Sequence, residues 1–173
     1  MRSIILATIL TTLMTTPAHA TCNGTIEKNM VFSDPEKPDT FVIETWGDTC
    51  AKAHMVIYVK NGAGWHPLVI GDLADFLSQE ATQATLPREL KLIADRIEGP
   101  MMSRLETWAE IQSASTQPKG EPWRGTPLVQ AEYERLYKAK SRYVFVPIGT
   151  PLAKMVVWDE HGKRPVDFIY YGD

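Results

Sequence analysis

The stretch AHMVIYVKNGAGWHPLVIGD, residues 53–72, decides the fold that this sequence predicts. Large apolar residues recur at every second position on both sides of its Asn61-Gly62 pair. Two alternating runs that flank an Asn-Gly pair are typical of a β-hairpin, and glycines adopt the positive φ angles of such a turn without strain. We therefore expect two antiparallel strands, with Lys60 opposite Trp65 beside the turn. The first strand should bury Met55, Ile57 and Val59.

Further strands are expected on both sides of this hairpin. The segments 25–32 and 41–46 predict two strands, separated by a charged turn that contains two prolines. Together with the hairpin they predict an antiparallel meander, because short connections favour pairing of consecutive strands. Near the C-terminus the pattern predicts a buried strand over residues 143–149. A second hairpin should follow, with strands over residues 153–158 and 166–172.

Helical segments are expected between the two blocks of strands. Thr85, with Pro87 just after it, is a typical helix start, and a Gly-Pro pair follows where that helix should end. Thr126 followed by Pro127 gives a second start of the same kind. The expected helices cover residues 73–80, 86–99, 102–113 and 127–140.

The order of strands, then helices, then strands predicts an α+β fold. We expect one antiparallel sheet of about six to seven strands, formed by the N-terminal meander and the C-terminal hairpin. Three to four helices should be inserted between the strand blocks and pack on one face of the sheet. A chain of this length suits a single domain, which we place at residues 21–173.

Residues 1–20 are expected to be a secretory signal peptide. A basic start, an apolar run over residues 4–14 and a small-x-small ending at residues 18–20 are typical of such a peptide. The apolar run is too short to span about 30 Å of hydrocarbon. Cys22 follows the expected cleavage site, but the residues before it lack the apolar-small-small pattern of a lipidation site. We therefore expect an exported protein, periplasmic or extracellular, without a membrane anchor.

The two cysteines, Cys22 and Cys50, predict one disulfide. Two cysteines in an exported protein allow a single intramolecular pairing, and oxidising compartments favour it. They are too far apart in sequence for a Cys-x-x-Cys redox motif. Closing this loop would stabilise the fold by about 3.5 kcal/mol in the chain-entropy model.

No catalytic, metal-binding or phosphate-binding motif stands out in the sequence. The histidines form no His-x-x-x-His or His-Glu-x-x-His pattern, so we expect neither a metal nor a cofactor. His54 and His66 are both expected to face outward from the central hairpin. If the protein is an enzyme, His66 is the candidate general base, with Glu44 or Asp72 as its carboxylate partner.

Residues 115–126, with the sequence STQPKGEPWRGT, form a long segment of low hydrophobicity. Its prolines and glycines predict a surface loop. The loop carries Trp123 and Arg124, and both residue types are enriched at the hot spots of protein interfaces. Either these two residues contact a partner, or Trp123 folds back and anchors the loop on its own domain.

These observations favour a binding protein over an enzyme. We expect a monomer, such as an inhibitor or accessory factor that docks on another envelope protein, and the formal net charge of −3 gives no reason to bind nucleic acid. The alternatives are a periplasmic hydrolase with His66 as general base, and a carrier of a small apolar ligand between helices and sheet. A flat aromatic surface over a packed core would favour the binding protein. A hydrogen bond from His66 to a carboxylate in a cleft would favour the enzyme.

Overall fold

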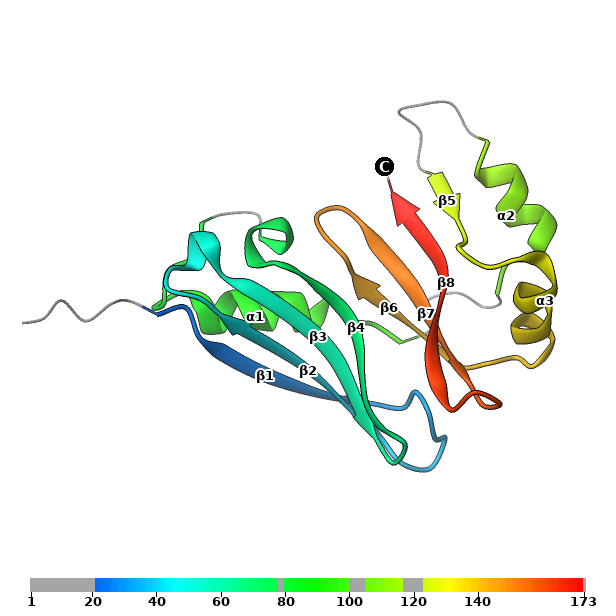
Figure 1. Ribbon diagram of the computed structural model, residues 1–173, viewed down its shortest axis with the longest axis horizontal. Helices are drawn as coiled ribbons and strands as arrows, with labels where there is room; N and C mark the ends of the chain where they lie inside the picture. The colour runs from blue at the N-terminus through cyan, green and yellow to red at the C-terminus, as the bar shows by residue number, and fades with distance from the viewer. Residues whose placement is uncertain (1–20, 78–79, 100–104, 117–122, 173) are drawn as a thin grey trace, which may run out of the picture.

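The computed structural model describes residues 21–77, 80–99, 105–116 and 123–172, and of Trp123 only the backbone. Within these ranges the chain forms eight β-strands in two antiparallel sheets and three α-helices (Figure 1). The α+β class that the sequence predicts is confirmed. The expectation of a single sheet is wrong, because the strands divide into two four-stranded sheets that share a core. The expected signal peptide lies outside the described residues.

Sheet A contains the four N-terminal strands in the order β1-β2-β3-β4. Each strand pairs antiparallel with the next, which confirms the predicted meander. Lys60 lies opposite Trp65 beside the β3–β4 turn, as the predicted hairpin register requires. The strands are β1 (Gly24–Met30), β2 (Asp39–Trp46), β3 (His54–Asn61) and β4 (Gly64–Asp72). The inward residues of β3 are Met55, Ile57 and Val59, all 0 % exposed.

A β-bulge interrupts the alternation in β4. The adjacent β3 residues Ile57 and Tyr58 lie opposite Val69 and Pro67 of β4. Leu68, between these two, therefore has no partner residue on β3. One extra residue in a strand shifts the faces of the residues beyond it, so the neighbours Leu68 and Val69 both contact the core. The expectation of unbroken alternation along this strand is wrong.

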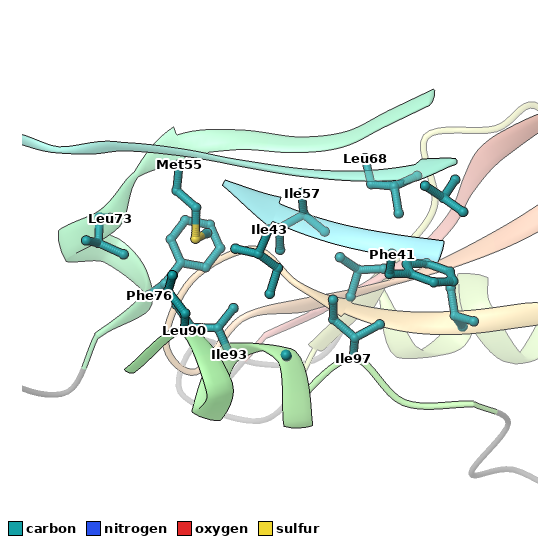
Figure 2. Packing of buried hydrophobic residues seen from close by; sticks show 14 of the residues in the cluster. Phe41, Ile43, Met55, Ile57, Leu68, Leu73, Phe76, Leu90, Ile93 and Ile97 are labelled. Carbon is teal, nitrogen blue, oxygen red and sulfur yellow. The ribbon is translucent and has the colours of Figure 1, made fainter. Parts of the chain in front are cut away.

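Helix α1 (Leu86–Asp95) packs against β1 on the inner face of sheet A. Gly24 permits this close approach, because a Cβ atom there would lie only 2.8 Å from Cδ1 of Leu90. Thr85 precedes the helix as predicted, but its side chain makes no capping hydrogen bond and instead accepts one from the backbone N–H of Thr82. Figure 2 shows the core between sheet A and α1, with Phe41, Ile43, Met55 and Ile57 from sheet A and Leu90 and Ile93 from α1.

Two short 3₁₀ turns flank the β3–β4 hairpin and contact each other. The helix expected over residues 73–80 is one of them, the single turn η2 (Leu73–Phe76). The other, η1 (Cys50–Lys52), carries the cysteine that is bonded to Cys22, with the two Cα atoms 4.9 Å apart. Both cysteines are buried. The predicted disulfide is confirmed, and it joins the segment before β1 to the start of the hairpin.

Sheet B has the strand order β5-β8-β7-β6. Its strands are β5 (Trp123–Gly125), β6 (Tyr143–Pro147), β7 (Ala153–Asp159) and β8 (Arg164–Gly172). The last three are the C-terminal strands that the sequence predicts, whereas β5 falls in the expected loop. Helices α2 (Trp108–Ala114) and α3 (Gln130–Lys138) pack on one face of sheet B, and sheet A packs on the other (Figure 1).

Strand β7 is buried on both sides because it lies between two cores. Val156 and Trp158 belong to the core shared with sheet A. Met155 and Val157 belong to the core shared with α2 and α3. Each of these four side chains is at most 3 % exposed. Neighbouring residues of one strand therefore serve different cores.

Both helices on sheet B start later than the sequence predicts. Helix α2 follows a capping box formed by Thr107 and Glu110, whereas a helix was expected from residue 102, inside a segment that the structure does not describe. Helix α3 follows a turn in which Thr126 Oγ1 accepts a hydrogen bond from Leu128 N at 3.2 Å. The prediction that Thr126 caps the helix directly is wrong. Among the helices of the described residues, none is long and apolar enough to cross a membrane.

Candidate binding face

The strand register of sheet A determines which side chains share the face that points away from α1. Because Met55 and Ile57 point inward, the residues between and beside them point outward. Following the pairing from strand to strand gives four rows of side chains, which we call the outer face. The rows are Trp46–His54–Asp72, Thr25–Glu44–Val56–Ile70, Glu27–Val42–Tyr58–Pro67 and Asn29–Thr40–Lys60–Trp65.

Large apolar side chains are exposed on the outer face. Trp65 is 61 % exposed, Ile70 is 72 % exposed and Trp46 is 45 % exposed. Among the described residues, three of the seven exposed large apolar side chains lie here. Helix α1 packs on the opposite face of this sheet, and α2 and α3 belong to the second core. Within the part of the chain that the structure describes, no helix covers this aromatic surface (Figure 1).

The ring of Trp65 is held in place by two neighbours on β3. It stacks on Tyr58, with ring centroids 4.9 Å apart and ring planes at 23°. The ammonium group of Lys60 lies 5.0 Å from the centroid of the same ring. Tyr58 is fixed in turn, because its hydroxyl donates a hydrogen bond to Glu44 Oε1 at 2.8 Å. The flat apolar surface of Trp65 is therefore already ordered.

Burial and the neighbouring Glu44 carboxylate raise the pKa of Tyr58 from its ordinary value to about 12. The Tyr58 hydroxyl therefore stays protonated, and it keeps donating to Glu44, throughout the neutral range. Glu44 was considered as a carboxylate partner for His66. Its hydrogen bond instead belongs to the support of the aromatic surface.

A second aromatic contact lies at the far end of the outer face. Trp46 and His54 are cross-strand neighbours whose ring centroids are 5.9 Å apart. His54 Nδ1 lies 2.9 Å from Asp72 Oδ1, and both side chains are more than half exposed, at 59 % and 66 %. Asp72, the other carboxylate considered for His66, is therefore paired with His54.

His66 points inward, which corrects the expectation that it faces outward. Cross-strand partners share a face, and the partner of His66 is the buried Val59. Its ring lies edge-on against Trp158, with centroids 5.6 Å apart. Its Nε2 atom is buried and has no hydrogen-bond partner among the described residues.

The structure does not bring the three candidate catalytic residues together. Glu44 bonds Tyr58 and Asp72 bonds His54 on the outer face, whereas His66 contacts Trp158 on the inner face. A general base needs its proton-transfer partner within hydrogen-bond reach. His66 therefore forms no catalytic pair with Glu44 or Asp72 in this structure.

Trp123 and Arg124 lie in a strand rather than in a surface loop. Their backbones pair with β8, where Trp123 is opposite Gly172 and Arg124 is opposite Tyr171. The guanidinium of Arg124 forms an ion pair with Glu106. It also lies over the ring of Tyr171, 5.9 Å from its centroid. The prediction of a loop over residues 115–126 is therefore wrong for residues 123–125, which form β5. The Arg124 side chain is bound within its own domain.

Sequence reasoning missed the polar cluster around Arg124. Glu106 Oε2 and the Tyr171 hydroxyl are buried and have no hydrogen-bond partner among the described residues. Burial and the Glu106 charge raise the pKa of Tyr171 above its ordinary value. Tyr133 donates a hydrogen bond from its hydroxyl to the Glu106 carbonyl at 2.8 Å. The cluster fixes the segment before α2 against α3 and β8.

A buried lysine at the junction of the sheets was also missed. Lys154 on β7 is only 6 % exposed. Its ammonium group donates to the Leu68 carbonyl at 2.6 Å and to Asp167 at 2.8 Å. Tyr170 donates a further hydrogen bond to Asp167 at 2.7 Å. A single lysine in an apolar strand gives no sequence signal for such a network.

A cleft of about 650 Å³ lies where the turns of the two sheets meet. Its walls come mainly from residues 33–40, 60–63 and 158–163. Several of its charges are already paired: Arg142 donates to the Phe32 carbonyl and to Glu160, each at 2.8 Å. Among the described residues, no group of three His, Cys, Asp or Glu side chains is placed to hold a metal ion. Glu27, Thr40 and Lys60 of the outer face also line this cleft, so the two surfaces adjoin.

No protein-family model, curated protein or solved structure matches this chain. The candidate site is therefore defined by its own geometry. That geometry is a sheet face that no helix of the described residues covers, with an ordered tryptophan near one end and a second tryptophan at the other.

Proposed function

We propose that this is a small exported binding protein that docks on another envelope protein through the outer face of sheet A. The observation that carries this proposal is the exposure of Trp65, Ile70 and Trp46 on one uncovered sheet face. Contiguous exposed apolar surface is typical of interaction sites. Tryptophan and tyrosine are also the residue types that dominate binding energy at protein interfaces.

The order of the aromatic surface supports the same proposal. Trp65 already stacks on Tyr58, and Tyr58 is held by Glu44. A side chain that is fixed before binding loses little rotamer freedom when a partner covers it. Such a surface therefore keeps more of its contact energy as affinity than a flexible loop does.

The disulfide supports export. Bridges such as Cys22–Cys50 persist in the oxidising compartments outside the cytoplasm. This agrees with the signal peptide expected at residues 1–20. Periplasmic and extracellular locations are both compatible with the bridge.

The two alternative functions receive less support. A hydrolase with His66 as base is not supported by its two candidate carboxylates, because Glu44 and Asp72 are hydrogen-bonded on the opposite face. A carrier of an apolar ligand would bind between helices and sheets, where apolar side chains form both cores and a pocket of about 370 Å³ lies beside α1, lined in part by Phe76, Leu92 and Ile93. Contact of Trp123 and Arg124 with a partner stays a prediction, and Arg124 would first have to leave Glu106.

Site-specific photocrosslinking tests the proposed docking. A photoreactive residue replaces Ile70 on the outer face or, as a matched control, Leu92 on α1, which is 48 % exposed. Each variant is expressed in its source cells, irradiated and analysed for covalent adducts with envelope proteins. We expect an adduct from position 70 and none from position 92.

A second substitution makes the crosslink specific for the aromatic surface. In the Trp65→Ala background the adduct from position 70 should largely disappear, because loss of an interface hot spot weakens binding by about 2 kcal/mol or more. Stability should change by less than about 1 kcal/mol, since the side chain is mostly exposed. An adduct of equal strength in the Trp65→Ala background, or adducts from both positions, would contradict docking through this face.

A further inference from the structure

The outer face carries more acidic than basic side chains among its exposed aromatic residues. Its four rows contain three acidic side chains, Glu27, Glu44 and Asp72, and one basic side chain, Lys60. Glu27 is exposed and has no ion-pair partner among the described residues. Asp72 is 66 % exposed and faces a histidine. Glu27 on β1 thus has no ion-pair partner among the described residues, and Asp72 on β4 is paired only with the exposed His54.

We propose that the partner presents a basic segment, in which arginine or lysine side chains alternate with apolar ones, to this face. This inference rests on the proposed function and adds the chemistry of the partner. Cationic groups would pair with Glu27 and Asp72, while apolar groups would cover Val56, Ile70 and Trp65. Complementary charge steers such an encounter and selects against partners of the wrong sign.

The tryptophans add a second reason for a cationic partner. A cation placed over an indole ring is attracted by the ring's negative face. Lys60 already uses this interaction, with its ammonium group 5.0 Å from the Trp65 centroid. Trp46, 45 % exposed beside the His54–Asp72 pair, has no lysine or arginine over its ring in the described structure. It offers a site where arginine can stack on the ring and pair with a carboxylate at the same time.

The same charges disfavour two other occupants. A second copy of this chain docked face to face would bring a face with the same excess of negative charge, and like charges brought together are destabilising. An anionic lipid surface would be repelled in the same way. A neutral glycan could stack on the tryptophans, but it would leave Glu27 without a counter-charge.

Four labelled peptides of the same length test the charge preference. Each alternates leucine with one other residue, which is arginine, lysine, glutamine or glutamate, and its binding to the disulfide-bonded mature protein is followed by fluorescence anisotropy. The arginine and lysine peptides should bind about three- to tenfold more tightly than the glutamine peptide, and the glutamate peptide should bind most weakly. The advantage should shrink several-fold as salt rises from about 0.05 M to about 0.5 M.

Two charge reversals localise the effect. Glu27→Lys on the outer face should remove most of the advantage of the arginine peptide. Glu132→Lys, the same change of charge on α3, should leave it unchanged, because α3 packs on the far side of sheet B. Thermal melting of both variants checks that each is folded before binding is compared.

The outcomes separate this inference from the proposed function. If the arginine and glutamine peptides bind equally well, and Trp65→Ala abolishes the binding of both, the charge preference is overturned but docking through the outer face is not. If a soluble peptidoglycan fragment binds and no peptide does, the occupant is a glycan and the basic segment is rejected. If the protein alone dimerises and Trp65→Ala abolishes the dimer, the occupant is a second copy of this chain and the basic segment is again rejected. If no peptide binds, the basic segment is also rejected, and the crosslink from position 70 decides the proposed function by itself.

Discussion

The ammonium nitrogen of Lys154 lies 2.6 Å from the carbonyl oxygen of Leu68, and this contact joins the two sheets. Leu68 is the bulged residue of β4, an edge strand of sheet A. Lys154 lies in β7, inside sheet B, and is also paired with Asp167. The carbonyl of the bulged residue is thus capped from the other sheet by a charged donor, which satisfies a polar group that the junction would otherwise leave without a partner.

Lys154→Met should destabilise the protein by about 1–3 kcal/mol, because it leaves the Leu68 carbonyl without its donor and removes the counter-charge of Asp167, whose side chain is 34 % exposed. Lys163→Met serves as the control, since Lys163 is paired with Glu160 on the surface at 3.0 Å. We expect the control to stay within about 0.5 kcal/mol of the parent protein. Urea denaturation measures both, and equal losses would show that the Lys154 contacts contribute little.

Ile57→Ala should cost about 2–5 kcal/mol of stability, because it removes a fully buried branched side chain and leaves a cavity. Lys60→Ala should stay within roughly 0.5 kcal/mol, because Lys60 is exposed on the outer face. If chemical denaturation ranks the two variants in the opposite order, the assignment of the inward and outward faces of β3 is wrong.

The Cys22–Cys50 bridge should be complete in protein exported to an oxidising compartment. Thiol titration of the denatured, unreduced protein should find no reactive cysteine. The Cys22→Ser and Cys50→Ser double variant should lose up to about 3.5 kcal/mol of stability through the wider freedom of its unfolded chain. Two titratable thiols per molecule would reject the bridge in the exported protein.

Asp159 should make stability depend on pH in the acid range. Both of its carboxylate oxygens accept hydrogen bonds from Arg135 at 2.9 Å, and these bonds lower its pKa from 3.8 to about 2. Because the folded pKa lies below the unfolded one, the unfolded chain takes up the proton first as pH falls. The stabilisation is therefore complete above about pH 5 and is lost as pH falls toward 2, by about 1–2 kcal/mol.

Asp159→Asn isolates this effect. At about pH 6 the variant should be less stable than the parent protein, and the difference between their free energies of unfolding should shrink as pH approaches 2. Urea denaturation at several pH values measures the difference. A gap that stayed constant over this range would show that the carboxylate is not held ionised by Arg135.

Local signals in the sequence predict most of the strands. The alternating runs on both sides of the turn predict the β3–β4 hairpin and the pairing of Lys60 with Trp65, although the two turn residues are Gly62 and Ala63 and Asn61 still pairs with Gly64. The alternation of β3 also predicts its buried face correctly. These features depend on neighbours along the chain, which is why composition and spacing are sufficient.

Features that depend on distant contacts were missed. The bulge at Leu68 is tied to sheet B through Lys154, more than eighty positions along the chain. One face of β7 packs in the core shared with sheet A, and the other packs against α2 and α3. The continuous apolar run of β7 does not specify which face meets which neighbour, so the division into two sheets was missed. Strand β5 has only three residues, next to a glycine and two prolines, and pairing with β8 alone makes it a strand.

The candidate site proposed from the structure differs from the residues that the sequence singled out. A flat aromatic surface was named as the feature of a binding protein, and the expected contact residues were Trp123 and Arg124. Arg124 is bound to Glu106, whereas Trp65 and Trp46 form the exposed surface. Tryptophan is highly buried on average, so the sequence alone gives no signal that these two rings are exposed.

The two cores that meet at β7 have a consequence for how the protein unfolds. Val156 packs with sheet A and the next residue, Val157, packs with α2 and α3, so one peptide unit connects both packings. Loosening either side would withdraw support from the strand that the other side needs. We therefore expect a single cooperative transition in which both halves melt together, so that a destabilising change near α2 or α3 also reduces the population of molecules with a folded outer face.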